Sequence, residues 1–563
     1  MTPPTDPIAA FRLASDLVDE VCALNPVMAT QLGVPGLDDE WGESFGLLGV
    51  EQVLELHQRF QPLVEPFLES GDARERLAAR VMVTAFDESR ASYENLDHFR
   101  SLRHIASPFH QIRLTFDIMK TDTSRARADI VRRLDTVEKP LGDYRELLEA
   151  GLASEVAVSA RQVASVIDQA RRLANDPTSI AEVVAKVETV DGPSRELTAA
   201  AEGARAAFAG FADWLEARYL PHAVARDGVG REAYERAADR LVGMSVDPLE
   251  AYEWGWDELR RLLAELEEVA EMIRPGDGVD ATKDHLETHP GLTASSTAEL
   301  LTFVDRVLSE AVTELAGSHF DVPDEIRPLT VQLAPAGSPL GVYYRRPSED
   351  FSRPGGVWYS LGEQETLFPL YQHVSTAYHE GFPGHHLQIA IAMYRRDSIS
   401  RFQRLLTWCP GYGEGWGMYA EVLMGELGYL EDPSHYFGML AKQLYRAARV
   451  VVDIGLHLGL SLPESSPIHR GEQWSFESAV EFMRIYGFRT GAQAREEVLR
   501  YLGWPGQAIS YKLGEREILR IRESARQRLG DDFELREFHS TVLGHGTTRL
   551  DLLREVVEEQ MGP

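Results

Sequence analysis

The sequence predicts a large, mainly α-helical fold in two lobes, with one small β-sheet. Three observations support this prediction. Apolar residues recur at helical spacing over most of the chain, and short turns with Pro or Gly separate the helices. Strand-forming residues gather between residues 327 and 361. The chain has 563 residues, of which 44% are hydrophobic, and this is ample for a large core or two lobes.

The two lobes are predicted over residues 1–275 and 276–563. From about residue 7 to residue 270 the chain is a succession of amphipathic helices, of which 126–134 is an example. The polar stretch 274–290, which opens with Arg-Pro-Gly-Asp-Gly, is the best candidate for a long loop between the lobes. We expect the first lobe to be a scaffold and the two lobes to form one intimate unit around a cleft.

The second lobe is predicted to begin with a capped helix that leads into the sheet. Ser296 and Glu299 have the spacing of a capping box. The helix after them would bury one apolar stripe, made of Leu300, Val304, Val307, Leu308, Ala311 and Leu315. A small sheet is expected over residues 327–361. From residue 367 the pattern is helical again, with breaks near 410–413, 463–467 and 503–506.

Charge and composition exclude several classes of partner. Lysine and arginine number 57 against 89 acidic residues, a formal net charge of −32, so we expect no nucleic-acid partner. No apolar run approaches the roughly 20 residues of a membrane span, and residues 1–6 lack the features of a signal peptide. Two distant cysteines, Cys22 and Cys409, suggest no disulfide framework, so the cytoplasm is the simplest location. The oligomeric state is left open.

One short segment carries residues for metal chemistry, His379-Glu380-Gly381-Phe382-Pro383-Gly384-His385-His386. Zinc hydrolases need imidazole and carboxylate ligands, an open position for water, and a carboxylate that takes the proton of that water. The usual helical solution is His-Glu-x-x-His, because residues four apart share one face. Three histidines and a glutamate within eight residues favour a metal site over capping or core histidines.

The spacing inside this segment predicts an interrupted helix. On an unbroken helix His386 would lie roughly 10 Å along the axis from His379, which is too far for one shared ion. Pro383 lacks a donor and its ring would clash with the carbonyl of His379, so the helix must bulge or break. A two-residue bulge would restore the i, i+4 relation between His379 and His385. His385 is therefore the predicted ligand, and His386 is the alternative.

A third ligand is expected from the segment 411–421, which holds two carboxylates seven residues apart. Glu414 would begin a helix after a Gly-rich turn and bind the metal directly. Glu421, two turns further on, would hold a histidine ring in place. Apolar neighbours such as Trp416 indicate that this helix is buried, and a buried carboxylate without a cation is costly.

These motifs resemble the domain-of-unknown-function 885 family, and the resemblance runs from about residue 25 over most of the chain. That family is similar to the helical zinc metallopeptidases that include carboxypeptidase Taq, thimet oligopeptidase and angiotensin-converting enzyme, which implies a metallopeptidase-like fold. In the carboxypeptidase Taq pattern, Gly-His-x-Leu ends the zinc helix and a later helix carries Gly-x-x-Glu. The resemblance thus implies His385 and Glu414 as ligands. Two extra residues before His385 depart from the pattern.

The same resemblance implies roles for residues nearer the C-terminus. Asp453 and His457, four residues apart, would support the site or contact the substrate. Tyr511 lies in a segment that resembles the tyrosine-bearing segment of the family, and its hydroxyl would donate to an oxyanion.

Together these assignments predict a zinc-dependent hydrolase of amide bonds, most simply a carboxypeptidase or oligopeptidase. One ion of zinc, with manganese or cobalt as substitutes, would be held by His379, His385 and Glu414. Glu380 would act as general base. A metal-dependent amidase of a specialised small molecule is the alternative. A non-catalytic helical binding protein is less favoured, because structural zinc sites usually include cysteine.

The expected substrate is a peptide or a small amide. Trp358 and Tyr359 lie in a β-rich run that could pair with an extended peptide by strand addition. The cationic side chains available for a substrate carboxylate are Arg345, Arg346, Arg489, Arg500 and Lys512.

Overall fold

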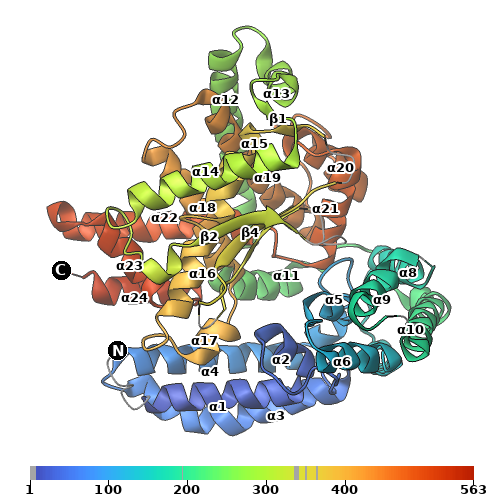
Figure 1. Ribbon diagram of the computed structural model, residues 1–563. Coiled ribbons are helices and arrows are strands. Elements are labelled where there is room, and N and C mark those ends of the chain that lie inside the picture. The colour runs from blue at the N-terminus through green and yellow to red at the C-terminus, as the bar shows by residue number, and fades with distance from the viewer. Residues whose placement is uncertain are drawn as a thin grey trace. The chain divides into compact units, whose positions relative to one another are not determined.

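Helices form most of the structure, and the predicted fold class, mainly helical with one small sheet, is confirmed; that sheet has three strands (Figure 1). The computed structural model describes residues 8–175, 177–192, 194–334, 341–348, 351–362 and 366–562. The first residues, where the sequence predicts no targeting segment, lie outside this part of the chain. No helix among the described residues is long and apolar enough to cross a membrane.

The chain divides into two compact units. The first contains Met1–Asp227, Ser400–Leu406 and Leu502–Trp504, and the second contains Gly228–Ile399, Thr407–Tyr501 and Pro505–Pro563. Along the chain, the main change of unit falls after Asp227, whereas the sequence suggested a boundary near residue 275. The scaffold role of the first lobe stays a prediction.

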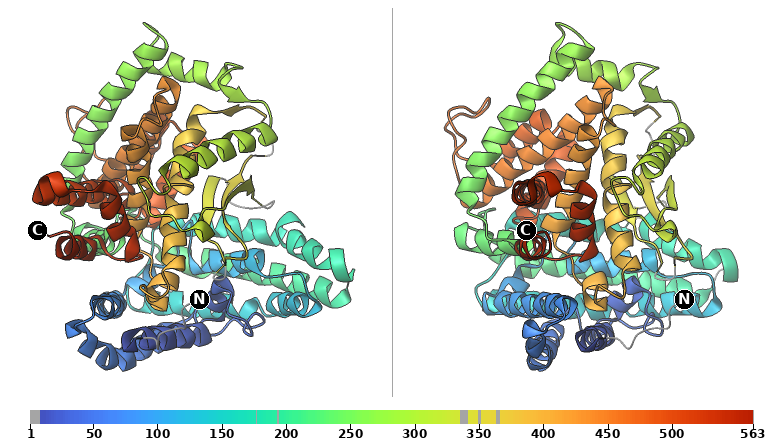
Figure 2. Two further views of the ribbon diagram at one scale, coloured as in Figure 1. Left: turned by 60° about the vertical axis from the view of Figure 1, so that its left-hand side comes forward. Right: turned by 90° about the vertical axis from the view of Figure 1, so that its left-hand side faces the viewer.

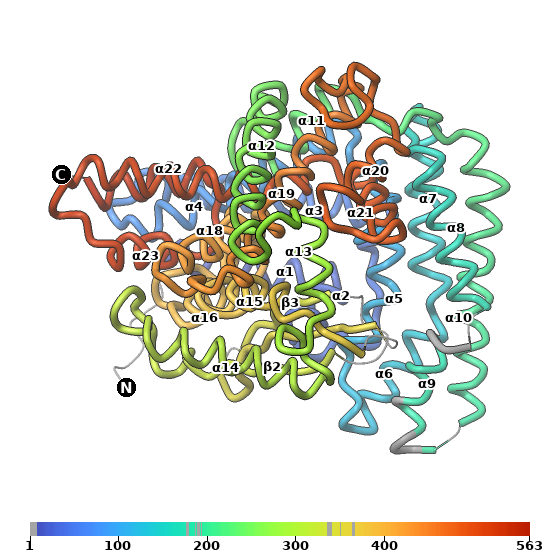
Figure 3. Tube along the Cα trace, turned by 90° about the horizontal axis from the view of Figure 1, so that it is seen from above, coloured from blue at the N-terminus to red at the C-terminus, as the bar shows by residue number. Residues whose placement is uncertain are grey.

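The first unit is built from helices. Its bounds are α1 Ala9–Leu24, α2 Pro26–Leu32, α3 Leu47–Val64, α4 Ala73–Glu94, α5 Pro108–Ile118, α6 Ser124–Asp135, α7 Glu138–Ala153, α8 Ala160–Asn175, α9 Pro177–Asp191, α10 Arg195–Trp214 and the short α17 Arg401–Leu405. Helices α8 and α10 lie side by side (Figure 3). An aromatic cluster that includes Phe109, Phe208 and Phe211 fills the core beside them, which explains the amphipathic pattern of this region.

The second unit holds the remaining helices and both sheets. The helices are α11 Arg231–Ala238, α12 Pro248–Ile273, α13 Gly278–Thr288, α14 Thr297–Leu315, α15 Tyr371–Glu380, α16 His385–Tyr394, α18 Pro410–Glu426, α19 Pro433–Leu458, α20 Phe476–Tyr486, α21 Gly491–Gly503, α22 Ser510–Leu529, α23 Leu535–Gly544 and α24 Leu550–Gln560. The long helices α12 and α19 pack closely, because Gly255 of α12 lets the side chains of Val450 and Val451 approach its backbone. The C-terminal helix α24, in red, packs against α22 (Figure 2).

The small sheet lies where the sequence predicts it. It contains β2 Leu329–Leu333, β3 Gly341–Arg345 and β4 Gly355–Ser360, in the order β2-β4-β3. Strand β4 pairs in parallel with β2 and antiparallel with β3, so that Trp358 lies opposite Gln332 and Tyr343. A second sheet is a short antiparallel pair of β1 Thr293–Ala294 and β5 Phe368–Pro369. The three-stranded sheet packs against α14, α15 and α16, and so adjoins the helices that carry the histidine motif (Figure 1).

Two local predictions differ from the structure. The polar stretch 274–290 is not one long loop, because it contains α13, whose Leu286 and Thr282 are buried. The break expected near 410–413 lies slightly earlier, at residues 406–409, because α18 begins at Pro410 and runs through the glycines. The capped helix is present: Ser296 accepts from the N–H of Glu299, and all six residues of the apolar stripe of α14 are buried. The return bond of the predicted capping box differs, because the carboxylate of Glu299 accepts from the N–H of Ser295 rather than from that of Ser296.

Candidate metal centre

The histidine motif lies where one helix ends and the next begins. Helix α15 ends at Glu380 and α16 begins at His385, so the predicted interruption is present, as a complete break rather than a two-residue bulge. The N–H of Gly384 donates to the carbonyl of Tyr378 at 3.0 Å. A side chain on Gly384 would overlap the carbonyl of His379, so this tight turn needs glycine. The turn brings His385 back toward His379.

Three side chains meet in what we call the metal triad, His379, His385 and Glu414. One possible ligand atom from each lies within 4.8 Å of the others. Oε2 of Glu414 is 3.4 Å from Nε2 of His379 and 3.5 Å from Nε2 of His385. Both histidines are buried, and Glu414 is partly exposed. Two imidazoles and one carboxylate form a donor set that could bind a metal, and they leave one of the usual four positions around zinc to a further ligand.

Helix α18 supplies Glu414 and also makes space for His379. Four glycines alternate along its first turns, although glycine normally destabilises a helix interior. A Cβ on Gly417 would lie 2.6 Å from Cε1 of His379, and a Cβ on Gly415 would lie 2.6 Å from the backbone of Gly514 in α22. The glycines therefore admit the imidazole ring and the close packing of α22, which carries Tyr511.

Glu421 holds the ring of His379 in one orientation. Its Oε1 lies 2.8 Å from Nδ1 of His379, so that this nitrogen donates to the carboxylate. Its Oε2 accepts a short hydrogen bond from the hydroxyl of Ser375 on α15. Because Nδ1 is held as a donor, Nε2 of His379, which faces Glu414, is the nitrogen that would bind a metal once its proton is displaced. His385 is oriented similarly, because its Nδ1 lies 3.4 Å from Oε1 of Gln388.

The acidic surroundings of the triad attract positive charge. Burial alone would raise the pKa of Glu414, but hydrogen bonds with His379 and His385 outweigh it and hold that pKa well below its ordinary value. Burial would lower the pKa of His379, yet Glu414 and Glu421 raise it to about 9. These carboxylates thus favour a cation between them, and a metal ion can replace the proton.

Glu380 lies beside the triad without belonging to it. Desolvation raises the pKa of its carboxyl, and the nearby His385 and His379 oppose that shift. Glu380, the last residue of α15, is therefore a partly exposed carboxylate whose pKa both imidazoles affect.

The neighbouring histidine, His386, points to different partners. Its Nε2 donates to the carbonyl of Ile326 at 2.7 Å, and its Nδ1 lies 3.1 Å from the hydroxyl of Tyr344. Both ring nitrogens are therefore engaged outside the triad. Burial lowers the pKa of His386 to about 4, as expected for a neutral core histidine. Of the two histidines that the sequence left open, the geometry favours His385.

Tyr511 lies against the triad from α22. Its ring is nearly parallel to that of His379, with 6.5 Å between the centroids. Burial and the charge of Glu414 raise the pKa of its hydroxyl, which keeps it protonated and able to donate. No hydrogen bond of this hydroxyl is found among the described residues, so it is available to a ligand.

Asp453 and His457 lie in a buried network on α19. Oδ2 of Asp453 accepts from the hydroxyl of Tyr234 at 2.7 Å and from the N–H of Gly506 at 3.0 Å. Nε2 of His457 donates to the carbonyl of Tyr501 at 3.0 Å. These bonds connect α19 with α11, α21 and the loop before α22 rather than with the triad. The contact with substrate that the sequence suggested stays a prediction.

Asp453→Asn is expected to change how stability depends on pH. Burial raises the pKa of Asp453 to about 7, so the folded protein favours the neutral carboxyl and loses stability as the pH rises from about 4 through 7. Asparagine cannot ionise and can still accept both hydrogen bonds. The stability of the variant relative to wild type should therefore grow over this range, by up to about 4 kcal/mol. Urea unfolding of metal-free protein at pH 5, 6, 7 and 8 measures this difference, and a constant difference would contradict it.

Two predicted substrate-binding cations already have partners. The ammonium of Lys512 lies 3.0 Å from Glu258 and from Glu515, and donates to Gln443 at 2.6 Å. Arg500 donates to Gln507 at 2.6 Å and has Glu497 3.6 Å away. A substrate would therefore compete with protein groups for either cation.

Trp358 and Tyr359 on β4 do not have the predicted role in peptide binding by strand addition. Strand β4 is the central strand, and both of its edges are already paired, so it cannot receive a peptide by strand addition. Trp358 instead contacts the guanidinium of Arg345, 5.6 Å from the ring centroid. Tyr359 is buried with its ring 5.6 Å from that of His373 on α15.

The family of the chain follows from a family model. Residues 26–557 match the model described as "Bacterial protein of unknown function (DUF885)". The chain belongs to the DUF885 family. This confirms the resemblance seen in the sequence. A search of curated proteins finds no match.

Two solved structures share the fold of this DUF885 chain. A "putative lipoprotein" from Colwellia psychrerythraea is 23% identical, with a TM-score of 0.81 over 98% of each chain. A "putative lipoprotein of unknown function" from Shewanella oneidensis is 16% identical, with a TM-score of 0.71 over 97% of this chain and 99% of its own. Pyrococcus furiosus carboxypeptidase is 12% identical over 91% of this chain and 98% of its own, but its TM-score of 0.33 is too low to support any inference.

Sequence reasoning missed the residues that surround the triad from α19. Arg446 and Arg449 both lie near Tyr511, with guanidinium carbons 5.8 and 4.9 Å from the centre of its ring. The sequence offered one signal for them: arginines stand among many apolar residues of α19, and buried arginines need partners.

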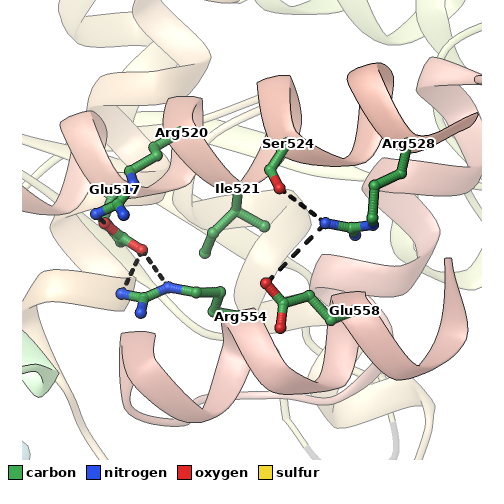
Figure 4. Close-up of a pocket in the computed structure, with 7 residues that line it drawn as sticks. All are labelled: Glu517, Arg520, Ile521, Ser524, Arg528, Arg554 and Glu558. Carbon is green, nitrogen blue, oxygen red and sulfur yellow. Dashed lines mark hydrogen bonds and ion pairs between the residues drawn. The ribbon is translucent and has the colours of Figure 1, made fainter. Parts of the chain in front are cut away.

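A separate pocket lies between α22 and α24 (Figure 4). Its charged side chains largely face one another: Arg554 donates to Glu517 at 2.7 Å, and Arg528 donates to Ser524 at 2.7 Å with Glu558 at 4.0 Å. Because these charges of both signs are paired with one another, the pocket favours neither an anionic nor a cationic ligand. The metal triad therefore remains the candidate site.

Proposed function

We propose that this DUF885 chain is a zinc-dependent hydrolase of amide bonds, most simply a metallopeptidase. The observation that carries the proposal is the meeting of His379, His385 and Glu414, whose ligand atoms lie within 4.8 Å of one another. Glu380 next to this triad supplies the additional carboxylate that a hydrolase needs and a purely structural metal site does not.

Each residue near the triad has a distinct chemical task in this proposal. A bound zinc ion would supply a Lewis acid and lower the pKa of water. Glu380 takes the proton of the attacking water and passes it to the leaving amine. The hydroxyl of Tyr511 donates to the oxyanion that forms at the substrate carbonyl. Glu421 keeps Nε2 of His379 directed at the triad through its 2.8 Å hydrogen bond with Nδ1.

Metal content tests the foundation of the proposal. Wild-type protein, stripped and reconstituted, is expected to bind about one zinc ion, and His379→Ala, His385→Ala and Glu414→Ala should each lose it, because two protein ligands hold zinc poorly. His386→Ala is the matched control and should keep the metal, since both nitrogens of His386 bond elsewhere. Elemental analysis of the folded proteins, checked by circular dichroism, gives the answer. Equal metal content in all five proteins would overturn the proposal, whereas preference for manganese or cobalt would change only the ion.

The location of the protein is a separate part of the proposal. The sequence predicts the cytoplasm, whereas two solved relatives are described as lipoproteins. These descriptions suggest the cell envelope rather than the cytoplasm. We therefore propose an envelope location, where an amide hydrolase would meet peptides from outside the cell.

A further inference from the structure

Five cationic side chains gather on the Tyr511 side of the metal triad. We call Lys442, Arg446, Arg449, Arg489 and Arg500 the cationic cluster. Nη2 of Arg446 lies 4.0 Å from Oε1 of Glu421, the carboxylate that orients His379. The guanidinium carbons of Arg489 and Arg449 lie 3.9 and 4.1 Å from the centre of the ring of Tyr445.

Two members of the cluster share one carboxylate of the protein. Arg449 donates to Glu497 at 3.0 Å and to the hydroxyls of Tyr445 and Tyr501. Arg500 shares Glu497. One negative charge therefore balances only one of these two arginines, and none is left over for the other three cations.

The remaining three cations lack such partners among the described residues. Neither Lys442 nor Arg489 has a carboxylate oxygen within 4.0 Å there, and the one near Arg446 belongs to Glu421, which is already bonded to His379 and Ser375. The Nε atoms of Arg446 and Arg489 are buried and have no hydrogen-bond partner in the described structure. Burial, with the charges of Arg489 and Arg446, lowers the pKa of Lys442 to about 7.

The overall composition of the chain does not explain why positive charge without a counter-charge gathers at this place. The sequence has 89 acidic and 57 basic residues, so a chance grouping of side chains would more often be acidic. Partly buried cations without counter-charges are costly, and an anion supplied from outside would remove that cost. Arginine nitrogens match a carboxylate in particular, because two parallel N–H groups can bind its two oxygens.

We propose that Arg446, Arg489 and Lys442 bind a carboxylate of the substrate. The inference rests on the proposed function, because it places this carboxylate beside the amide that the triad would attack. The ring of Tyr511 lies 6.5 Å from that of His379 and 5.8 Å from the guanidinium carbon of Arg446, so the carboxylate would be about one to three residues from that amide, at ~3.5 Å per residue. It is either the C-terminal carboxylate of a peptide or an acidic side chain near the cleaved bond.

Peptide binding to metal-free protein tests this inference without relying on hydrolysis. The first probe pair is N-acetyl-trialanine and its C-terminal amide, and the second is N-acetyl-Ala-Asp-Ala-amide and its Asn counterpart. Calorimetric titration of the full chain should show roughly tenfold or tighter binding of the charged member of one pair. A preference in the first pair identifies a terminal carboxylate, and a preference in the second identifies a side chain.

Variants assign the preference to the cluster. The double substitution Arg446→Gln with Arg489→Gln should remove it, whereas Arg484→Gln with Arg526→Gln, an equal charge change at exposed positions of α20 and α22, should keep it. Equal binding within both pairs, or no binding at tens of millimolar peptide, would overturn the inference, and this wild-type comparison does not depend on how the variants fold. Loss of metal from the triad variants is measured separately, so failure of the proposed function and failure of this inference are distinguishable.

Discussion

The Glu380→Gln variant is expected to lose amide hydrolysis while it keeps its metal. The carboxylate follows directly after His379 at the end of α15, where it is subject to the charges of both imidazoles and of Glu414. Glutamine has almost the same shape but cannot accept a proton. The value of kcat/KM should therefore fall by roughly 10²–10⁴-fold, the usual contribution of a general base. The measurement pairs steady-state hydrolysis of a peptide library with elemental analysis of the same samples.

Metal content decides how the result is interpreted. If Glu380→Gln also loses the metal, Glu380 is a ligand and the general base must be found elsewhere. If the variant keeps both metal and activity, the mechanism is wrong even though the site exists. Glu431→Gln, the same chemical change at an exposed position of the second unit, controls for the loss of one negative charge and should leave kcat/KM unchanged.

The metal triad could be predicted because its residues lie in two short segments with informative spacing. Pro383 excludes a continuous helix through the motif, and that exclusion alone points to His385. The sequence could not decide against His386, because the geometry of a helix break cannot be read from the sequence, and another break could direct the adjacent histidine at the metal. The decision depends on Ile326 and Tyr344, which reach His386 from positions 60 and 42 residues earlier in the chain.

The alternating glycines of α18 show why the local structure was harder to predict. In a single sequence, four glycines between 411 and 417 indicate a turn, because each one weakens a helix. The structure has a helix there because each glycine faces an obstacle that a side chain would strike. These obstacles are the backbone of Val242, the ring of Trp408, the backbone of Gly514 and the ring of His379. Three of the four come from distant parts of the chain, and only Trp408 lies close in sequence.

The cationic cluster lay beyond sequence reasoning for a related reason. Lys442 and Arg446 lie on one helix, whereas Arg489 comes from the segment before α21. No spacing rule connects these positions. Arg489 had been one of five candidates for a substrate carboxylate, and only its contact with Tyr445 relates it to Arg449.

The Gly417→Ala variant is expected to lose metal affinity through one added methyl group. Its Cβ would lie 2.6 Å from Cε1 and 2.8 Å from Nδ1 and Nε2 of His379, closer than real Cβ contacts allow. The ring cannot move aside freely, because Glu421 holds Nδ1 at 2.8 Å and Glu421 is itself bonded to Ser375. Displacement of one ligand should weaken zinc binding by roughly 10- to 100-fold or more. Competition with a zinc chelator measures this change.

A second glycine on the same helix separates ligand displacement from helix propensity. At Gly425 an added Cβ would find its nearest neighbour, Cδ1 of Leu430, at an ordinary 3.7 Å. Gly425→Ala should therefore stabilise α18 by up to about 1 kcal/mol and leave metal affinity unchanged. Gly417→Ala should gain nothing, since overpacking costs about 1–3 kcal/mol. If both variants bind zinc as tightly as wild type, His379 does not bind the metal from its position in this structure. A histidine that binds the metal while it is packed against Gly417 of α18 would be displaced by the added methyl group, and zinc affinity would fall.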